Sequence, residues 1–163
     1  MDRIKRLLDR ALETLVMVVV AILVLDVLWQ VFTRFVLKRP SSWTEELATF
    51  LLIWVALLGG AVALGRGAHL GIDYFVGRLP ERTRLKTEAF AFACIAVFSL
   101  FVMVAGGMDL VLTTFRLHQI SPALHLDIGY VYLAVPISGA FLVLYSVIGL
   151  IERITALMRR QRL

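Results

Sequence analysis

Residues 47–64 read LATFLLIWVALLGGAVAL, a run without a single charged side chain. A membrane-spanning helix needs about 20 mostly apolar residues, because the hydrocarbon core is about 30 Å thick and each residue rises about 1.5 Å. This run reaches that length if its helix starts near Trp43. Helix is the expected state, since strands that do not close into a barrel leave backbone groups unpaired in lipid. The run therefore predicts a membrane-spanning helix.

Three further apolar runs accompany it. Residues 14–33 carry one charge, Asp26, and residues 89–108 and 128–151 carry none. Of the 163 residues only 18% are charged, against about 25% in soluble domains. We expect an all-α membrane protein, a four-transmembrane-helix bundle in which residues 1–163 form a single domain. The predicted spans are about 14–36, 44–65, 86–110 and 127–151.

Lysine and arginine are distributed unevenly between the spans. The N-terminal tail has four, the middle loop five and the C-terminal end four, whereas the first loop has three and the third loop one. The positive-inside rule then places both termini and the middle loop in the cytoplasm. These basic residues flank a membrane and form no basic groove, so membrane lipids, and not nucleic acid, are the expected surroundings.

Local motifs mark the helix starts and the middle loop. Ser42 and Glu45 have the spacing of a capping box, and Glu45 and Glu46 lie at the positive end of the second helix dipole. Asp127 suits the N-cap of the fourth helix.

In the middle loop, apolar residues within 72–79 recur at i, i+3, i+4 and i+7. This spacing predicts a short interfacial helix on the cytoplasmic side.

Small residues gather on two of the predicted helices: Ala56, Gly59, Gly60, Ala63, Gly106 and Gly107. Small side chains allow helices to approach closely in a membrane. Packing within the bundle is the interpretation we favour, and a seam for a partner helix is the alternative.

Asp26, Gln30 and Arg34 follow one another at a spacing of four and share a helix face. Arg34 lies near the outer interface, where its side chain can reach the headgroups. Asp26 lies near mid-membrane, where an unpaired aspartate costs about 2.5–3.5 kcal/mol, so it should face protein. Two uses stay open: a structural anchor bonded to Gln30 or to a partner helix, and an ion or proton site.

The sequence offers no catalytic or metal-binding pattern. His69, His118 and His125 lie outside the apolar runs and match neither a zinc motif nor a haem clamp. Phosphate-binding loops, a nucleophile elbow and paired carboxylates are likewise missing from the sequence. We therefore expect no enzymatic activity, no cofactor and no metal site.

Several short motifs between about residue 15 and residue 151 are shared with one family of transporter subunits. They are Gln30-Val31-Phe32, Arg34, Pro40, Trp43-Thr44-Glu45-Glu46-Leu47-Ala48, Trp54, Leu58-Gly59, His69-Leu70-Gly71-Ile72-Asp73, Leu79-Pro80, Ser121-Pro122-Ala123-Leu124, and Tyr132 to Pro136. With them the chain resembles the small permease (Q) subunit of tripartite ATP-independent periplasmic (TRAP) transporters. Asp127 departs from the pattern, because many relatives are expected to carry proline there.

The resemblance implies a subunit of a secondary, usually sodium-driven, importer in a bacterial or archaeal cytoplasmic (inner) membrane. A periplasmic solute-binding protein captures an organic acid, and a large TRAP permease subunit carries the ion and solute sites. The four-helix subunit scaffolds that large subunit. Since the chain ends soon after its fourth span, we expect a separate small subunit and not one fused to the large permease.

Partner-interface or structural roles follow for the polar and aromatic residues of the motifs. Arg34, Trp43, Glu45 and Glu46 are expected at the outer edge, where they touch the partners or simply cap and anchor helices. A different hypothesis is a self-sufficient small four-helix proton-coupled multidrug exporter, acting as a homodimer through Asp26.

Overall fold

The structure, a computed structural model, describes residues 2–39, 41–67 and 80–160. Four of its helical segments are long and apolar enough to cross a membrane: Leu7–Phe35, Ser42–Gly65, Thr83–Arg116 and Gly129–Met158. The predicted all-α fold with four membrane helices is therefore confirmed. The predicted interfacial helix falls within 68–79, outside the described residues.

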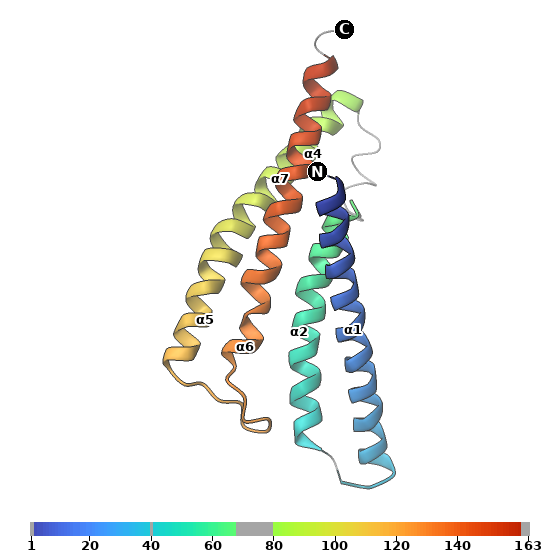
Figure 1. Cartoon of the computed structure of the whole chain (residues 1–163), viewed down its shortest axis with the longest axis vertical. Coiled ribbons are helices and arrows are strands. Elements are labelled where there is room, and N and C mark those ends of the chain that lie inside the picture. The colour runs from blue at the N-terminus through green and yellow to red at the C-terminus, as the bar shows by residue number, and fades with distance from the viewer. Residues whose placement is uncertain (1, 40, 68–79, 161–163) are drawn as a thin grey trace.

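The helices form two antiparallel hairpins (Figure 1). Helix α1 (Asp2–Phe35) packs on α2 (Ser42–Gly65). The third span joins α4 (Glu81–Phe98), the π-helix η1 (Ser99–Gly106) and α5 (Gly107–Arg116), and it packs on the fourth. The fourth span consists of α6 (Gly129–Tyr132) and α7 (Ala134–Arg160).

Two ends of the bundle can be told apart. Helix α1 begins and α7 ends at the same end, which we call the terminal end (Figure 1). The connections after α1 and before α6 lie at the opposite end, the loop end. Both α1 and α7 extend farther toward the chain termini than hydropathy predicts, because charged residues continue these helices beyond the apolar runs.

Proline explains why the fourth span is interrupted. The Leu133 N–H donates to the Gly129 carbonyl and the Ile137 N–H to the Leu133 carbonyl, each at 3.2 Å. Between them, Pro136 has no N–H to donate to the carbonyl of Tyr132. The helix is therefore broken between α6 and α7.

The α1 face toward α2 follows a regular spacing of four and three residues. Its buried and half-buried members are Leu12, Val16, Val19, Leu23, Asp26, Gln30 and Thr33. An average spacing of 3.5 residues is typical of the seam between two helices that pack side by side, as in coiled coils. We call this face the α1 seam.

Small residues bring α7 close to the third span. A Cβ added at Gly139 would lie 2.7 Å from the Met103 Cβ, and one at Gly149 would lie 2.6 Å from the Phe92 ring. By contrast, a Cβ added at Gly59 or Gly60 meets no atom within 4 Å. The prediction that these two α2 glycines serve packing within the bundle is therefore wrong. It is confirmed for Gly107 of α5, where an added Cβ would lie 2.9 Å from the Val135 side chain, and the glycines of α7 have the same role.

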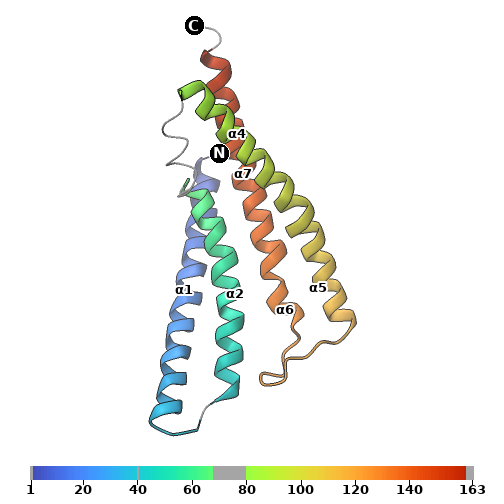
Figure 2. The same cartoon turned by 180° about the vertical axis from the view of Figure 1, so that it is seen from behind.

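The hydrophobic core lies where α1, α2, α4 and α7 meet. Its buried members are Leu12, Leu58, Ala61, Leu64, Phe92 and Tyr145. Figure 2 shows the two hairpins close together toward the terminal end and leaning apart toward the loop end. The core thus fixes the hairpins at one end, and other contacts must position them at the other.

Candidate partner interface

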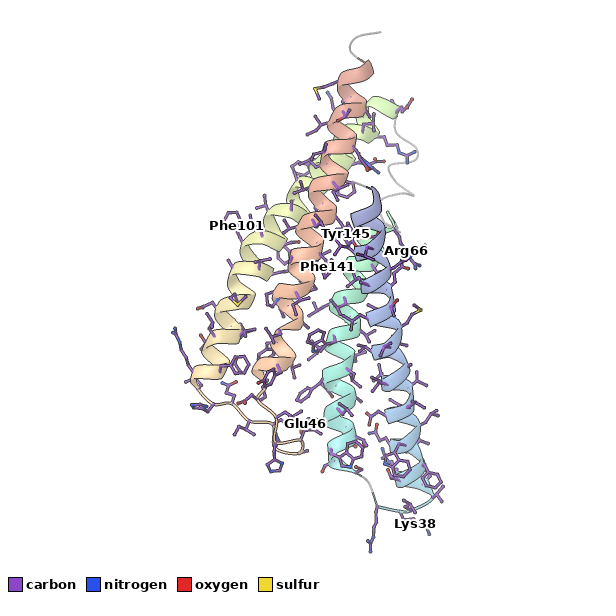
Figure 3. All side chains as sticks on the ribbon, in the orientation of Figure 1. Lys38, Glu46, Arg66, Phe101, Phe141 and Tyr145 are labelled. Carbon is purple, nitrogen blue, oxygen red and sulfur yellow. The ribbon has the colours of Figure 1, made fainter. Side chains whose placement is uncertain are left out.

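Glu46 connects the two hairpins at the loop end (Figure 3). Its Oε2 accepts hydrogen bonds from the backbone N–H groups of Ala123, at 2.9 Å, and Leu124, at 3.0 Å. Ser121, which is fully buried, lies within hydrogen-bonding reach of the same carboxylate. The beginning of α2 is therefore bound to the connection before α6.

That connection is itself a small hairpin. Ile120 and Asp127 form an antiparallel bridge. The Ser121 N–H donates to the Leu126 carbonyl at 2.8 Å, and the Ile128 N–H donates to the Gln119 carbonyl at 2.9 Å. We call residues 119–128 the loop hairpin; its shape is set by its own backbone bonds and its position by Glu46.

Asp127 does not cap the fourth span. The N-cap of α6 is Ile128, which makes no side-chain cap bond, and Asp127 pairs with Ile120 in the bridge. The capping prediction for Asp127 is wrong, because the chain is still in the loop hairpin at this residue.

Large side chains surround the loop hairpin. Leu117, Ile120, Leu126 and Tyr130 are all more than half exposed, and Trp43 in the first turn of α2 is 44% exposed. Aromatic and large aliphatic side chains are typical of the central parts of protein interfaces. The loop end therefore offers an apolar surface on a fixed backbone.

The predicted outer-edge residues lie at this end but differ in their contacts. Arg34, in the last turn of α1, and Glu45, in the first turn of α2, are exposed.

The predicted capping box of Ser42 and Glu45 is wrong. The N-cap is Ser41, which makes no side-chain cap bond, and the Thr44 hydroxyl donates to the Ser41 carbonyl at 2.8 Å. Since α2 begins at Ser42, that residue comes one position too late to cap it.

Asp26 lies on the α1 seam and is only 6% exposed, so it faces protein. Neither of its carboxylate oxygens has a hydrogen-bond partner within the described residues. The expected bond to Gln30 is not made; Gln30 is half-buried one turn farther on, and its carbonyl accepts the Thr33 hydroxyl at 2.9 Å. Arg34 is exposed and lies off the seam, so the predicted polar stripe is divided.

The two remaining candidates lie farther along α2. Trp54 packs against the hydrophobic core, and Gly59 borders open space. The predicted residues therefore do not converge on one site. Those at the loop end form a candidate interface, and Asp26, Trp54 and Gly59 lie deeper in the spans.

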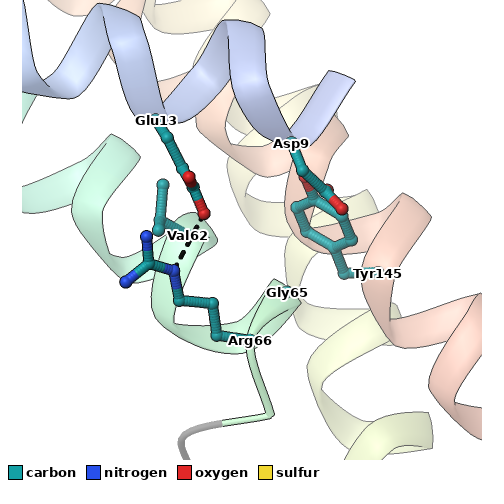
Figure 4. A pocket seen from close by; sticks show the side chains of 6 residues that line it. All are labelled: Asp9, Glu13, Val62, Gly65, Arg66 and Tyr145. Carbon is teal, nitrogen blue, oxygen red and sulfur yellow. Dashed lines mark hydrogen bonds and ion pairs between the residues drawn. The ribbon is translucent and has the colours of Figure 1, made fainter. Parts of the chain in front are cut away.

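A polar cluster at the terminal end escaped the sequence analysis. The Tyr145 hydroxyl donates to Asp9 at 2.6 Å, and Arg66 donates to Glu13 at 2.8 Å. With Val62 and Gly65 these residues line a cavity of about 40 Å³ (Figure 4). The Glu13 carboxylate holds the pKa of Arg66 above its ordinary value. Asp9 and Glu13 are one helical turn apart, and this spacing is the feature of the sequence that indicates a polar cluster here.

A second ion-pair group ties α4 to α7. Glu88 accepts from Arg84 at 2.8 Å and from Arg153 at 3.1 Å. The Arg153 guanidinium also lies 5.2 Å from the centre of the Phe92 ring.

Within the part of the chain that the structure describes, no three His, Cys, Asp or Glu side chains are placed to hold a metal ion.

Comparison with known proteins identifies the family. Residues 22–156 match the family described as tripartite ATP-independent periplasmic transporters, DctQ component. The chain is 35% identical over 82 residues to the sialic acid TRAP transporter small permease protein SiaQ of Vibrio cholerae, a match that covers 50% of this chain and 47% of SiaQ. It is 37% identical over 73 residues to the sialic acid TRAP transporter permease protein SiaT of Haemophilus influenzae, covering 42% of this chain and 12% of SiaT.

A putative TRAP transporter small permease protein of Haemophilus influenzae matches along most of its length. The identity is 26% over 149 residues, which covers 90% of this chain and 88% of that protein. By contrast, this chain spans less than half the length of SiaQ and about an eighth of that of SiaT. The family match includes the second and third membrane helices, the loop hairpin, the second half of the first helix and nearly all of the fourth. The chain belongs to the DctQ component family of the tripartite ATP-independent periplasmic transporters, as a multi-pass membrane subunit of a transporter.

Proposed function

We propose that this chain is a non-transporting scaffold subunit that holds a large permease subunit in the membrane. The assembled transporter takes up an organic acid, and a sodium gradient across the membrane drives this uptake. The family match, which extends from the middle of the first span to near the end of the fourth, is the observation that carries the proposal. The two relatives named for sialic acid, itself an organic acid, support the substrate class.

The local bonding of the buried hydroxyls supports a role without transport. Four of them, those of Thr33, Thr44, Thr114 and Ser138, donate to a carbonyl three or four residues before them, while those of Ser99 and Ser146 have no partner among the described residues. A transport site needs polar groups from several helices that converge on one point. Hydroxyls that bond back along the chain contribute no such lining, so we place the ion and solute sites in the large subunit.

The charge distribution supports an orientation. With both termini in the cytoplasm by the positive-inside rule, the loop end faces the periplasm. The loop hairpin fixed by Glu46, with Trp43 beside it on α2, is then the surface for the solute-binding protein or for the periplasmic side of the large subunit. A surface whose backbone is already ordered loses little conformational entropy on binding.

Co-purification tests the proposal. The tagged chain is expressed together with the large permease subunit of the same transporter, and the membranes are solubilised in mild detergent. We expect the large subunit to elute with the tagged chain in a defined ratio. Recovery of the tagged chain alone, with the large subunit folded and present in the same membranes, contradicts the proposal.

The buried carboxylate of Asp26, which has no hydrogen-bond partner among the described residues, favours a second candidate, a proton-coupled exporter that works without other subunits. Such an exporter protects cells from cationic drugs when expressed alone, and Asp26→Asn abolishes the protection. A scaffold subunit gives no protection in either form. A drug-resistance assay with the chain and this variant separates the two functions.

A further inference from the structure

An apolar groove runs along the outer face of the third span. It has a volume of about 480 Å³ and is lined by Ala93, Cys94, Val97, Phe98, Phe101 and Val102. These residues belong to α4 and the first turn of η1, so the groove crosses the junction between the two helices. Figure 3 shows Phe101 on the side of this span away from α1 and α2.

The groove is open to the surroundings of the bundle. Val97, Phe98, Phe101 and Val102 are each more than half exposed. Helix α7 covers a different face of the same span, where Phe92 and Ser99 are buried. The groove is therefore free to receive something from outside the chain.

Its length fits one leaflet of a bilayer. Ala93 and Val102 are about 14 Å apart along the axis at about 1.5 Å per residue. This is about half the thickness of a hydrocarbon core of about 30 Å. The volume also lies in the range of about 300–1,000 Å³ that is usual for small-ligand sites. An extended acyl chain matches both dimensions.

A cation lies above the groove on the same helix face. Lys86, Phe90, Ala93 and Val97 occur at i, i+4, i+7 and i+11, which keeps them on one side of α4. Lys86 lies about 10 Å before Ala93 along the axis, toward the terminal end, and its side chain is exposed. Among the described residues its ammonium has no ion-pair partner. A lysine in this place extends toward the headgroup region.

We propose that this groove holds one acyl chain of an anionic phospholipid whose phosphate is bound by Lys86. The apolar lining accounts for the chain, and the charge of Lys86 accounts for the anionic headgroup. A partner helix is the poorer fit, because membrane helix interfaces are rich in small residues. Four of the six groove residues are phenylalanine or valine, and the exposed Ala105 and Gly106 of the same span lie outside the groove lining.

Native mass spectrometry of the purified full chain tests the site. The protein in mild detergent receives equal amounts of phosphatidylglycerol and phosphatidylcholine with the same acyl chains. We expect about fivefold more of the phosphatidylglycerol adduct, the enrichment that one lysine near an anionic headgroup produces. Lys86→Gln should bring the ratio to about one, whereas Lys38→Gln, an exposed lysine at the loop end, should leave it unchanged.

A groove-filling variant tests the acyl-chain site. Cys94→Trp places an indole in the groove and should lower retention of both lipids several-fold. Leu100→Trp, at an exposed position of the same span outside the groove lining, is the matched control and should retain lipid as the unaltered chain does. Thermal unfolding followed by circular dichroism confirms that all variants are folded.

Three results would overturn the proposal. The first is an equal affinity of the unaltered chain for the two lipids, and the second is a preference that survives Lys86→Gln. The third concerns Cys94, the single cysteine of the chain. In membranes, Cys94 is treated with a lipid-soluble maleimide with and without the large permease subunit. If the reaction is complete without that subunit and fully blocked with it, a helix and not a lipid covers the groove.

Discussion

Two acidic side chains inside the spans have opposite surroundings. Glu46 accepts two backbone N–H groups from the loop hairpin. Asp26 is buried on the α1 seam with no hydrogen-bond partner within the described residues. A buried carboxylate without partners is costly, while one that receives backbone donors stabilises the segment that supplies them. At the scale of residues, Glu46 is therefore the stabilising carboxylate of the loop end.

Glu46→Ala should lower the free energy of unfolding by about 1–3 kcal/mol, because the N–H groups of Ala123 and Leu124 lose their acceptor. Hydrogen exchange at these two amides should accelerate, as measured by mass spectrometry in detergent. Glu45→Ala is the matched control. Glu45 is exposed, the Thr49 hydroxyl donates to its backbone carbonyl, and its carboxylate accepts no hydrogen bond from any residue that the structure describes. Equal effects of the two variants would show that Glu46 does not hold the loop hairpin.

Tyr145→Phe should cost about 1–2 kcal/mol, because it removes the hydrogen bond to Asp9 and keeps the ring in the core. Denaturation in mixed detergent micelles measures the change. Tyr130→Phe serves as the control, since this tyrosine is exposed and within the described part of the chain its hydroxyl donates no hydrogen bond. A loss of stability in Tyr130→Phe as large as in Tyr145→Phe would contradict the assignment.

At the scale of elements, the two hairpins pack by different means. The α1 seam uses mostly branched and polar side chains at a spacing of 3.5 residues. The seam between α7 and the third span uses Gly139 and Gly149, which admit Met103 and Phe92. The second seam depends on close approach, so it tolerates added volume poorly.

Gly139→Ala should destabilise the protein by about 1–3 kcal/mol, because the new methyl group meets Met103 and the helices must move apart. Gly60→Ala is the contrasting variant: its methyl group meets nothing, and alanine favours helix over glycine by about 0.8–1.0 kcal/mol. We therefore expect opposite changes in melting temperature in the isolated chain. A destabilising Gly60→Ala would mean that α2 packs against a surface at this residue.

The sequence was sufficient for the number and the order of the membrane helices, because hydropathy and length are local properties of each run. It was insufficient for the faces on which the helices meet. Gly59 and Gly60 look like packing residues in the sequence, whereas nothing in the sequence around Gly139 and Gly149 distinguishes them as the residues that α7 presents to the third span. Which face of an apolar helix is buried depends on its neighbours, and a helix that is apolar all round gives no periodic signal.

The candidate site was predicted only in part for a similar reason. The place of Glu46 at a helix start predicts an interaction with the helix dipole, whereas its actual partners are the amides of Ala123 and Leu124. No local pattern links residues so far apart in the chain. The capping box failed by one residue, because sequence rules locate helix ends only to within a residue or two.

At the scale of the whole molecule, the contacts between hairpins lie at both ends. The terminal end holds the core and the Asp9–Tyr145 bond. The loop end holds the bond from Glu46 to the loop hairpin. Between these ends, most of α1 is exposed along the apolar part of its length. This arrangement suits a subunit that presents long apolar helices to lipid and to a partner.

Ion flux through the chain alone tests the scaffold function most directly. The purified chain is reconstituted into liposomes, and the entry of radioactive sodium is followed with and without a panel of organic acids outside. A scaffold with no path of its own gives the flux of empty liposomes, and uptake requires the large permease subunit and the binding protein. The scaffold function is contradicted if this chain alone lets sodium or solute enter well above the level of empty liposomes and Asp26→Asn abolishes that entry.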